Sequence, residues 1–154
     1  MQVSDLLRPE AVKVSGQMTS KKRLFQELGE IAESVYGIAA RDATEALQER
    51  ENLGATGVGH GVALPHARIT GIGAVHGIFM KLERAMEFGA VDKQPIDLVF
   101  ALFARRDSGV DHLKALALVS RTLRDSGVCG KLRANSDPAK LYAILTEDSS
   151  SQAA

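Results

Sequence analysis

The sequence contains one cysteine, no net charge and no long hydrophobic run, and each absence excludes a class of protein. The lone Cys129 cannot form an internal disulfide framework or a zinc site built from several cysteines. The 19 basic and 19 acidic side chains balance, whereas domains that bind nucleic acid are usually strongly basic. No apolar run approaches the roughly 18–20 residues of a membrane span. We therefore expect no nucleic-acid partner and no membrane insertion.

The N-terminus, which reads MQVSDLLRPE, lacks the basic start and the apolar core of a secretory signal. We therefore expect a cytoplasmic protein. The chain has 154 residues, of which 45% are hydrophobic and 25% are charged, as is usual for one globular domain. A chain of this length buries about 68–70% of its unfolded surface, which suffices without a disulfide or a structural metal. We expect one domain over residues 1–148 and a disordered tail over residues 149–154.

The spacing of apolar residues predicts an α/β domain. Helices are predicted over residues 20–36, 42–53, 111–125 and 137–145, with a helical turn near 128–133. Strands are predicted over residues 11–14, 62–64, 74–82 and 96–104. The last of these, IDLVFALFA, has the length and composition of a buried central strand. The order of the elements predicts a single domain in which helices flank a mixed β-sheet.

Local signals also predict where the helices begin and which faces they bury. Ser20 is expected to cap one helix, which Gly37 would end, and Asp42 with Glu45 has capping-box spacing. Cys129 is expected in a polar turn. The predicted inner face of the helix over 111–125 consists of Leu113, Leu116, Ala117, Ser120 and Leu123.

Glycine and histidine are concentrated in one stretch of the chain. Seven of the 14 glycines and three of the four histidines, His60, His66 and His76, lie within residues 54–77. Because ordering a glycine costs conformational entropy, the cluster indicates backbone geometry that other residues cannot adopt. The segment TGVGHG matches neither a dinucleotide-binding nor a Walker loop, and the histidines lack the spacing of HExxH. We therefore expect no nucleotide cofactor and no metal site.

Three side chains could together handle a phosphoryl group. His66 follows Pro65 at the end of a short predicted strand, Arg50 ends the preceding helix, and His112 lies in the first turn of a later one. A neutral imidazole is a nucleophile near neutral pH, and an arginine can hold phosphate oxygens with two hydrogen bonds. A helix N-terminus also attracts anions. The alternative is that His66 is an isolated surface histidine.

The stretch ERENLGATGVGHGVALPHAR, from Glu49 to Arg68, resembles the signature of the fructose/mannitol-type enzyme IIA domains of the bacterial phosphotransferase system. The resemblance continues through QPIDLVFALFA and DHLKALALVSRTLRD and spans essentially the whole chain. Within that family, the chain is most similar to the nitrogen-regulatory branch. The resemblance implies a mixed sheet flanked by helices, which agrees with the elements predicted above.

The resemblance also implies a role for each candidate residue. His66 matches the histidine that an HPr-like phosphocarrier phosphorylates, Arg50 the arginine that stabilises the phosphoryl group, and His112 the second active-site histidine. No nucleotide or metal is implied, because the phosphoryl group arrives on a phosphohistidine. Mannitol-type members often carry an acidic residue where this chain has His60, which we expect to be a loop residue. The loop that would cradle the oxyanion contains Thr56, Gly57, Gly59 and Gly61.

Two functions are compatible with the resemblance. One is regulatory: the phosphorylation state would control partners such as potassium transporters or sensor kinases. The other is a sugar-specific relay that passes phosphate to a IIB domain. The lack of a linker or membrane segment favours the regulatory function. Residues 105–133 carry seven basic and three acidic side chains, which form either a solvated helical face or a docking face for an acidic partner.

Overall fold

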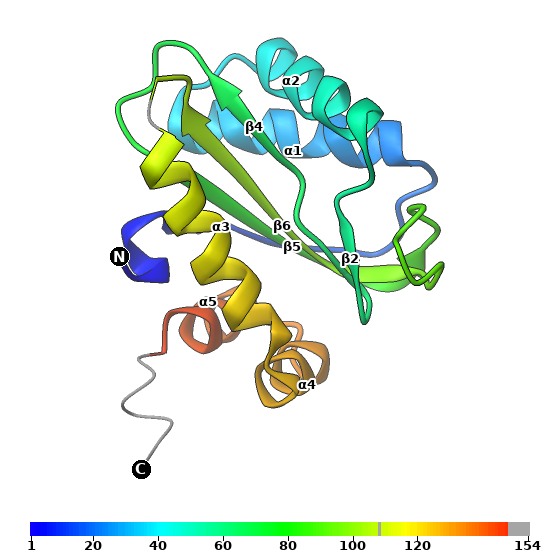
Figure 1. Cartoon of the computed structure of the whole chain (residues 1–154). Helices are drawn as coiled ribbons and strands as arrows, with labels where there is room; N and C mark the ends of the chain where they lie inside the picture. Colours follow the sequence, from blue (N-terminus) through cyan, green and yellow to red (C-terminus); the bar gives the residue numbers. More distant parts are fainter. Residues whose placement is uncertain (108, 148–154) are drawn as a thin grey trace.

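The computed structural model describes residues 1–107 and 109–147 (Figure 1). Within these residues, the strands form one mixed sheet with the order β1-β5-β6-β3-β2. Strand β4 lies beside β6 in the same register as β3, so β3 and β4 form one interrupted line along β6. The strands are β1 (Leu7–Ser15), β2 (Gly57–Gly59), β3 (Val62–Ala63), β4 (His66–Ile69), β5 (His76–Met86) and β6 (Ile96–Arg105).

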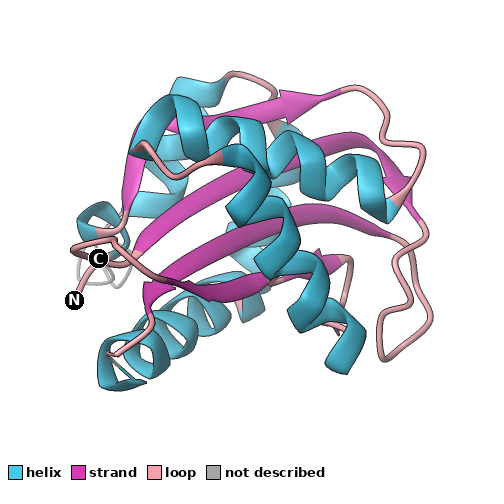
Figure 2. Cartoon of the chain, turned by 90° about the horizontal axis from the view of Figure 1, so that it is seen from above, coloured by secondary structure: helices cyan, strands magenta, loops and turns pink. Residues whose placement is uncertain are grey.

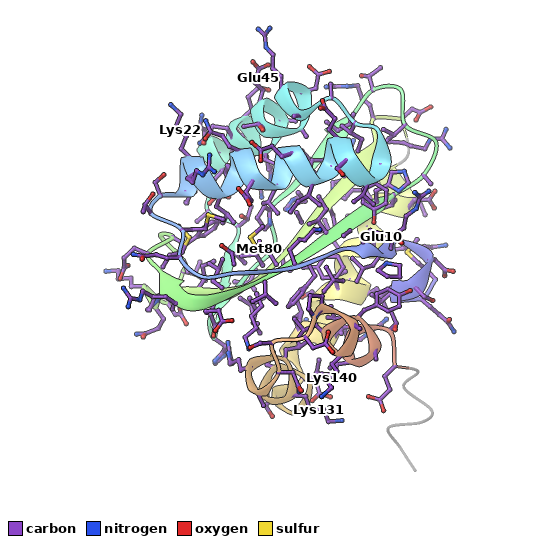
Figure 3. All side chains as sticks on the ribbon, turned by 180° about the vertical axis from the view of Figure 1, so that it is seen from behind. Glu10, Lys22, Glu45, Met80, Lys131 and Lys140 are labelled. Carbon is purple, nitrogen blue, oxygen red and sulfur yellow. The ribbon has the colours of Figure 1, made fainter. Side chains whose placement is uncertain are left out.

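Helices cover both faces of the sheet, as Figures 1 and 2 show. One layer contains α1 (Lys21–Tyr36) and α2 (Ala40–Leu53), which pack on each other. The other contains α3 (Gly109–Arg124), α4 (Ser126–Ala134) and α5 (Pro138–Thr146), and a short 3₁₀ turn, η1 (Val3–Asp5), precedes the sheet. In Figure 3, Lys22 and Glu45 extend outward from the first layer and Lys131 and Lys140 from the second, while Met80 lies in the interior. The predicted α/β fold is confirmed.

Strand β6 is the central strand that its composition predicts. It pairs antiparallel with β5 on one side and parallel with β3 and β4 on the other. Every residue from Leu98 to Ala104 is buried, as expected for a strand covered by helices on both faces. Phe100 packs on Phe79 of β5 with 6.3 Å between ring centroids. This strand is therefore the middle of the core, and its neighbour β4 carries the candidate site.

Helix α1 confirms the predicted ends, whereas α2 begins earlier than predicted. The Ser20 hydroxyl accepts the Arg23 N–H at 3.1 Å, and Gly37 ends α1 with a left-handed φ of 71°. The capping box predicted at Asp42 is wrong, because α2 already begins at Ala40. The Ala40 N–H donates instead to the Glu33 carboxylate at 2.9 Å. A side chain of the previous helix thus provides the cap, which no local pattern within α2 signals.

Helix α3 is rotated relative to the prediction. Its buried residues are His112, Ala115, Val119 and Leu123, whereas Leu113 is 67% exposed. Of the predicted inner face, Leu123 is buried and Leu116 is partly buried against the core, whereas Leu113 and Ala117 were wrongly placed on it. Small and β-branched side chains allow α3 to lie close to the sheet, and His112 is turned inward, where it gains a polar partner. Cys129 also differs from the prediction: it is buried in α4, and its thiol donates to the Leu123 carbonyl at 3.1 Å.

The close contact between α1 and α2 depends on Gly29. A Cβ at this position would lie 2.7 Å from the Ala40 carbonyl oxygen and closer still to the Thr44 hydroxyl. We expect Gly29→Ala to lower the unfolding free energy by about 1–3 kcal/mol, because the helices must separate. Gly130→Ala, also within a helix but with open space around the new methyl, should stabilise by up to about 1 kcal/mol through helix propensity. Urea denaturation measures both, and equal effects would contradict a steric role for Gly29.

The predicted disordered tail, residues 149–154, lies outside the described residues. In the described part of the chain, no helix combines the length and apolar character needed to cross a membrane.

Candidate active site

His66 begins strand β4 directly after a break in the strand line. Leu64 and Pro65 separate β3 from β4, and the Pro65 carbonyl accepts the Leu102 N–H at 2.9 Å. The Nδ1 of His66 lies 2.8 Å from the Leu64 carbonyl oxygen. Since a carbonyl can only accept, Nδ1 carries the proton and Nε2 retains its lone pair. The backbone break therefore presents His66 with Nε2 as the available nucleophile.

The surroundings of His66 keep its ring neutral. Partial burial lowers its pKa below the usual value, and the positive charge of Arg50 lowers this pKa further. The hydrogen bond to Leu64 and the charge of Glu51 oppose this shift. A histidine whose pKa is already below neutrality is unprotonated at pH 7 and can act as a nucleophile.

His112 approaches His66 from helix α3. The ring centroids lie 5.4 Å apart, with an angle of 69° between the planes. His112 is 7% exposed, and its Nε2 atom is buried without a hydrogen-bond partner among the described residues. Burial and the nearby His66, Arg68 and Arg50 lower its pKa to about 4. His112 is therefore neutral at pH 7.

The side chain of Arg68 contacts the second histidine, His112. Its Nε donates to Nδ1 of His112 at 3.3 Å. A neutral imidazole that accepts at Nδ1 must carry its proton at Nε2. The buried Nε2, which has no hydrogen-bond partner among the described residues, is therefore an N–H donor on a ring that lies beside His66.

The end of helix α2 contributes Arg50. Its Nη1 donates to the Gly54 carbonyl at 2.9 Å, and its charge acts on both histidines. The next residue, Glu51, is a buried carboxylate that accepts from the Thr56 amide and hydroxyl and from Nζ of Lys21 at 2.8 Å. These bonds fix the end of α2 to the following loop and hence position Arg50.

The structure brings His66, His112 and Arg50 together, but two of the four predicted loop residues, Thr56 and Gly57, bond to other parts of the chain. The amide and hydroxyl of Thr56 both bond to Glu51, and the Gly57 carbonyl accepts the Val91 N–H. Gly59 and Gly61 flank the tip of the β2–β3 hairpin with φ values of 101° and 78°. Their role as an oxyanion cradle stays a prediction.

The hairpin tip is held by residues far along the chain. His60 lies there with a left-handed φ of 56°, and its amide donates to the Asp92 carboxylate at 3.0 Å. Arg133 donates to the His60 carbonyl at 2.7 Å and forms an ion pair with Asp97 at 2.9 Å. His60 thus holds a loop position through its backbone. Arg133, part of the basic excess noted in the sequence, is paired rather than free.

Sequence reasoning missed Arg68 as a site residue. Strand β4 was not predicted, and without it the two-residue spacing between His66 and Arg68 has no meaning. In a strand, alternate residues share a face, and the intervening Ala67 is buried. Once strand β4 is known, the two-residue spacing predicts that Arg68 lies on the same face of the strand as His66.

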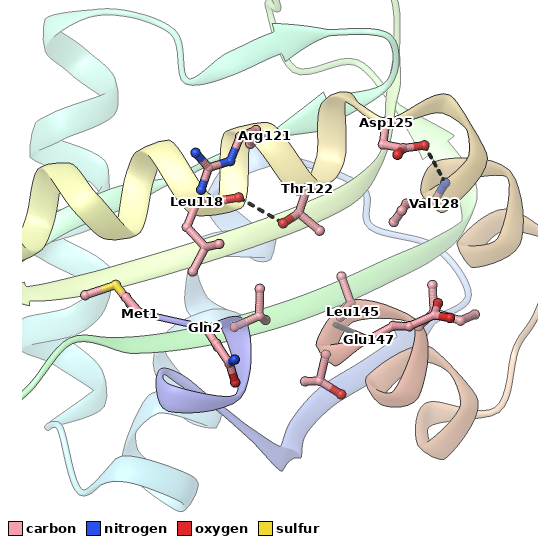
Figure 4. A pocket seen from close by; sticks show the side chains of 12 residues that line it. Met1, Gln2, Leu118, Arg121, Thr122, Asp125, Val128, Leu145 and Glu147 are labelled. Atoms are coloured by element: carbon pink, nitrogen blue, oxygen red, sulfur yellow. Dashed lines mark hydrogen bonds between the residues drawn. The ribbon is translucent and has the colours of Figure 1, made fainter. Parts of the chain in front are cut away.

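Two hollows lie elsewhere on the molecule. One, of about 510 Å³, lies between η1, α3 and α5 and includes Met1, Leu118 and Arg121 (Figure 4). The other, of about 630 Å³, lies between the β2–β3 hairpin and helices α3 and α4. None of His66, His112 and Arg50 lines either hollow. The histidine pair is instead at the edge of the sheet, where the half-exposed His66 is accessible to another protein.

The low pKa of His112 predicts an effect of pH on stability. Between pH 6.5 and the folded pKa of about 4, the unfolded chain binds a proton at His112 that the folded protein does not, so stability falls as the pH falls. We expect the unfolding free energy, measured with urea at pH 7 and pH 4.5, to drop less in His112→Gln than in the unmodified protein. Equal drops would show that His112 does not titrate abnormally.

Fold and site together define a class: an α/β domain with two adjacent histidines, both with lowered pKa values, and an arginine near them at one edge of the sheet. The family model described as "Phosphoenolpyruvate-dependent sugar phosphotransferase system, EIIA 2" matches residues 5–148. The chain belongs to this family.

Similar proteins carry names from the nitrogen-regulatory branch. A nitrogen regulatory protein of Bradyrhizobium diazoefficiens is 43% identical over 145 residues, which cover 94% of this chain and 95% of that protein. The nitrogen regulatory protein of Escherichia coli K12 is 36% identical, over 96% of this chain and 91% of its own length. The crystal structure of nitrogen regulatory protein IIA-Ntr from Neisseria meningitidis has a TM-score of 0.85 at 32% identity and covers 94% of this chain and 99% of its own. The resemblance stated from the sequence is confirmed.

Proposed function

We propose that this protein is a nitrogen-type IIA protein that accepts a phosphoryl group on Nε2 of His66 from an HPr-like phosphocarrier and regulates partner proteins through its phosphorylation state. The observation that carries the proposal is the Nδ1–H bond from His66 to the Leu64 carbonyl at 2.8 Å. It leaves Nε2 of the neutral ring with its lone pair, and this half-exposed ring lies beside the ring of His112 and within the influence of the Arg50 charge. This arrangement suits acceptance of an activated phosphoryl group.

The proposed transfer exchanges one P–N bond for another. The Nε2 lone pair of His66 attacks the phosphorus, and the bond from phosphorus to the donor's histidine breaks with its electron pair returning to the donor nitrogen. Positive charge then develops on the His66 ring, where the Leu64 carbonyl accepts the Nδ1–H and stabilises it. Arg50 and the Nε2–H of His112 would hold the phosphoryl oxygens. Positioning and charge neutralisation supply most of the catalysis in such transfers.

Phosphorylation in a reconstituted system tests this proposal. The protein is incubated with phosphoenolpyruvate, an enzyme I-type protein and an HPr-like phosphocarrier, and its mass is measured. We expect one added phosphoryl group that is stable in base and labile in acid, as a phosphohistidine is. A reaction without the phosphocarrier is the control. No incorporation, or incorporation that survives acid, would overturn the proposal.

Arg50→Lys should slow this phosphorylation although the charge is kept. Lysine cannot offer the planar fork that binds two phosphate oxygens, and loss of a well-placed donor at such a site justifies an expected slowing of at least about tenfold. Arg41→Lys, an exposed position on the same helix, is the matched control and should react normally. The initial rate of phosphoryl incorporation measures both, and an unchanged rate in Arg50→Lys would remove Arg50 from the site.

The regulatory function and the sugar relay differ in what the phosphorylated protein does next. The names of the relatives described above support regulation. We propose that the protein acts in the cytoplasm, with potassium transporters or sensor kinases as the kind of target. A relay would instead pass the group to a sugar-specific IIB domain. Mixing the phosphorylated protein with purified IIB domains and following phosphate loss distinguishes them. Efficient transfer would favour the relay, while phosphate retention supports regulation.

A further inference from the structure

Arg68 has an unusual position among the cations of the site. Its Nε donates a hydrogen bond to Nδ1 of His112 at 3.3 Å. This contact joins strand β4 to helix α3, and the two residues are 44 positions apart in the chain. Its Nη2 lies near the first residue of α3, where a Cβ on Gly109 would be 3.7 Å away. The side chain therefore runs from β4 across to the beginning of α3 and reaches His112 from the side of its Nδ1.

We propose that Arg68 is a positioning residue: by donating from Nε to Nδ1 of His112, it holds that ring in the Nε2–H form and directs the N–H toward the phosphoryl group on His66. The role of the N–H toward a phosphoryl group rests on the proposed function. The tautomer of His112, in contrast, can be measured without any phosphorylation. A hydrogen bond to one imidazole nitrogen commonly sets the state of the other nitrogen, as in histidines that bind metals.

Burial explains why such a partner is needed. His112 is buried, and without a donor at Nδ1 its proton could lie on either nitrogen. With the proton on Nδ1, Nε2 would present a lone pair to an anion and repel it. With the proton on Nε2, the same atom attracts phosphoryl oxygens. The Arg68 bond thus selects the useful one of two tautomers before the phosphoryl group arrives.

A direct contact from the Arg68 charge to phosphate is the competing role, and side-chain length separates the two. Glutamine places its amide nitrogen the same number of bonds from the backbone as Nε of arginine, but it carries no charge. Methionine has similar length and no donor. If Arg68 acts through His112, Arg68→Gln keeps the Nε2–H form of His112 and a near-normal phosphorylation rate, whereas Arg68→Met loses both. If Arg68 acts through its charge, both substitutions lower the phosphorylation rate equally.

The first experiment measures the state of His112 in the unphosphorylated protein. Two-dimensional ¹H–¹⁵N spectra of the histidine rings at pH 7 should show His112 protonated at Nε2 in the unmodified protein and in Arg68→Gln. In Arg68→Met, the population protonated at Nδ1 should increase. Arg106→Met is the matched control, since this exposed arginine bonds to Thr70 instead; its His112 signals should not move. An Nδ1–H state in the unmodified protein, or no change in Arg68→Met, would overturn the proposal.

The second experiment measures the rate of phosphorylation by the phosphocarrier. Arg68→Met should react roughly 10- to 100-fold more slowly, the range found for partners that orient metal-binding histidines, and Arg68→Gln should recover most of that loss. Arg106→Met should react like the unmodified protein. Thermal unfolding of each variant confirms that it is folded. Equal rates for Arg68→Gln and Arg68→Met would overturn the positioning role, whereas no reaction in the unmodified protein would overturn only the proposed function.

Discussion

His66→Gln is expected to abolish phosphorylation by the phosphocarrier. The substitution removes the ring whose Nδ1 bonds to Leu64 and whose Nε2 is the proposed nucleophile. An amide nitrogen has no available lone pair, so no P–N bond can form. We expect incorporation below detection, with the fold retained, because the half-exposed position tolerates a polar side chain. Mass measurement after incubation with the donor system gives the result.

His60→Asn is the matched control for His66→Gln. His60 lies at the hairpin tip with a left-handed φ of 56°, a conformation that asparagine tolerates better than most residues. Its backbone bonds to Asp92 and Arg133 do not depend on the imidazole. Phosphorylation of His60→Asn should therefore be normal. Phosphoryl incorporation in His66→Gln would show that His66 is not the acceptor, and loss of incorporation in His60→Asn would show that the His60 imidazole is needed as well.

Glu51→Ala is expected to cause the largest loss of stability among the substitutions considered. The carboxylate is buried and binds the amide and hydroxyl of Thr56 as well as Lys21. Its removal leaves the buried polar groups of Thr56 without partners, at a cost of about 3 kcal/mol for the two groups. That is a large part of the roughly 5–15 kcal/mol by which domains are stable. Urea denaturation at pH 7 measures the change.

Glu45→Ala makes the same chemical change on the same helix. Glu45 is exposed and pairs with Arg41 at 3.1 Å, so its loss should cost no more than about 0.5 kcal/mol. A larger stability loss in Glu51→Ala than in Glu45→Ala would therefore be caused by the burial of Glu51 and of the groups that it binds. Glu51→Ala should also slow phosphorylation, because the end of α2 that carries Arg50 loses its attachment to Thr56. Similar stability losses in the two variants would contradict the role given to Glu51.

The elements with strong local signals were predictable from the sequence. Helix α1 has its apolar stripe between Ser20 and Gly37, and both ends are set by neighbouring residues. Strand β6 is recognisable because a run of buried apolar residues has one stable place, the middle of a covered sheet. The short strands β2 and β4 were missed, since segments of three or four residues carry too little periodicity to stand out.

The candidate site was predictable only in part, for a related reason. His66 and Arg50 lie near each other in the chain, so sequence position and side-chain chemistry already pointed to them. His112 lies in a distant helix, and its imidazole and its place in the first turn of that helix also pointed to it. Arg68 and Glu51 did not enter, because their importance comes from the atoms that they contact, and those contacts exist only after folding.

The sequence by itself determined the α/β class, the central strand and the types of side chain available for phosphoryl chemistry, because these depend on local periodicity and on the residues themselves. The tertiary structure alone decided which face of α3 is buried, where α2 begins and which nitrogen of His112 carries a proton. Each of these depends on a partner from another element: the sheet for α3, Glu33 for α2 and Arg68 for His112. Free energies that arise between distant segments are absent from any local pattern.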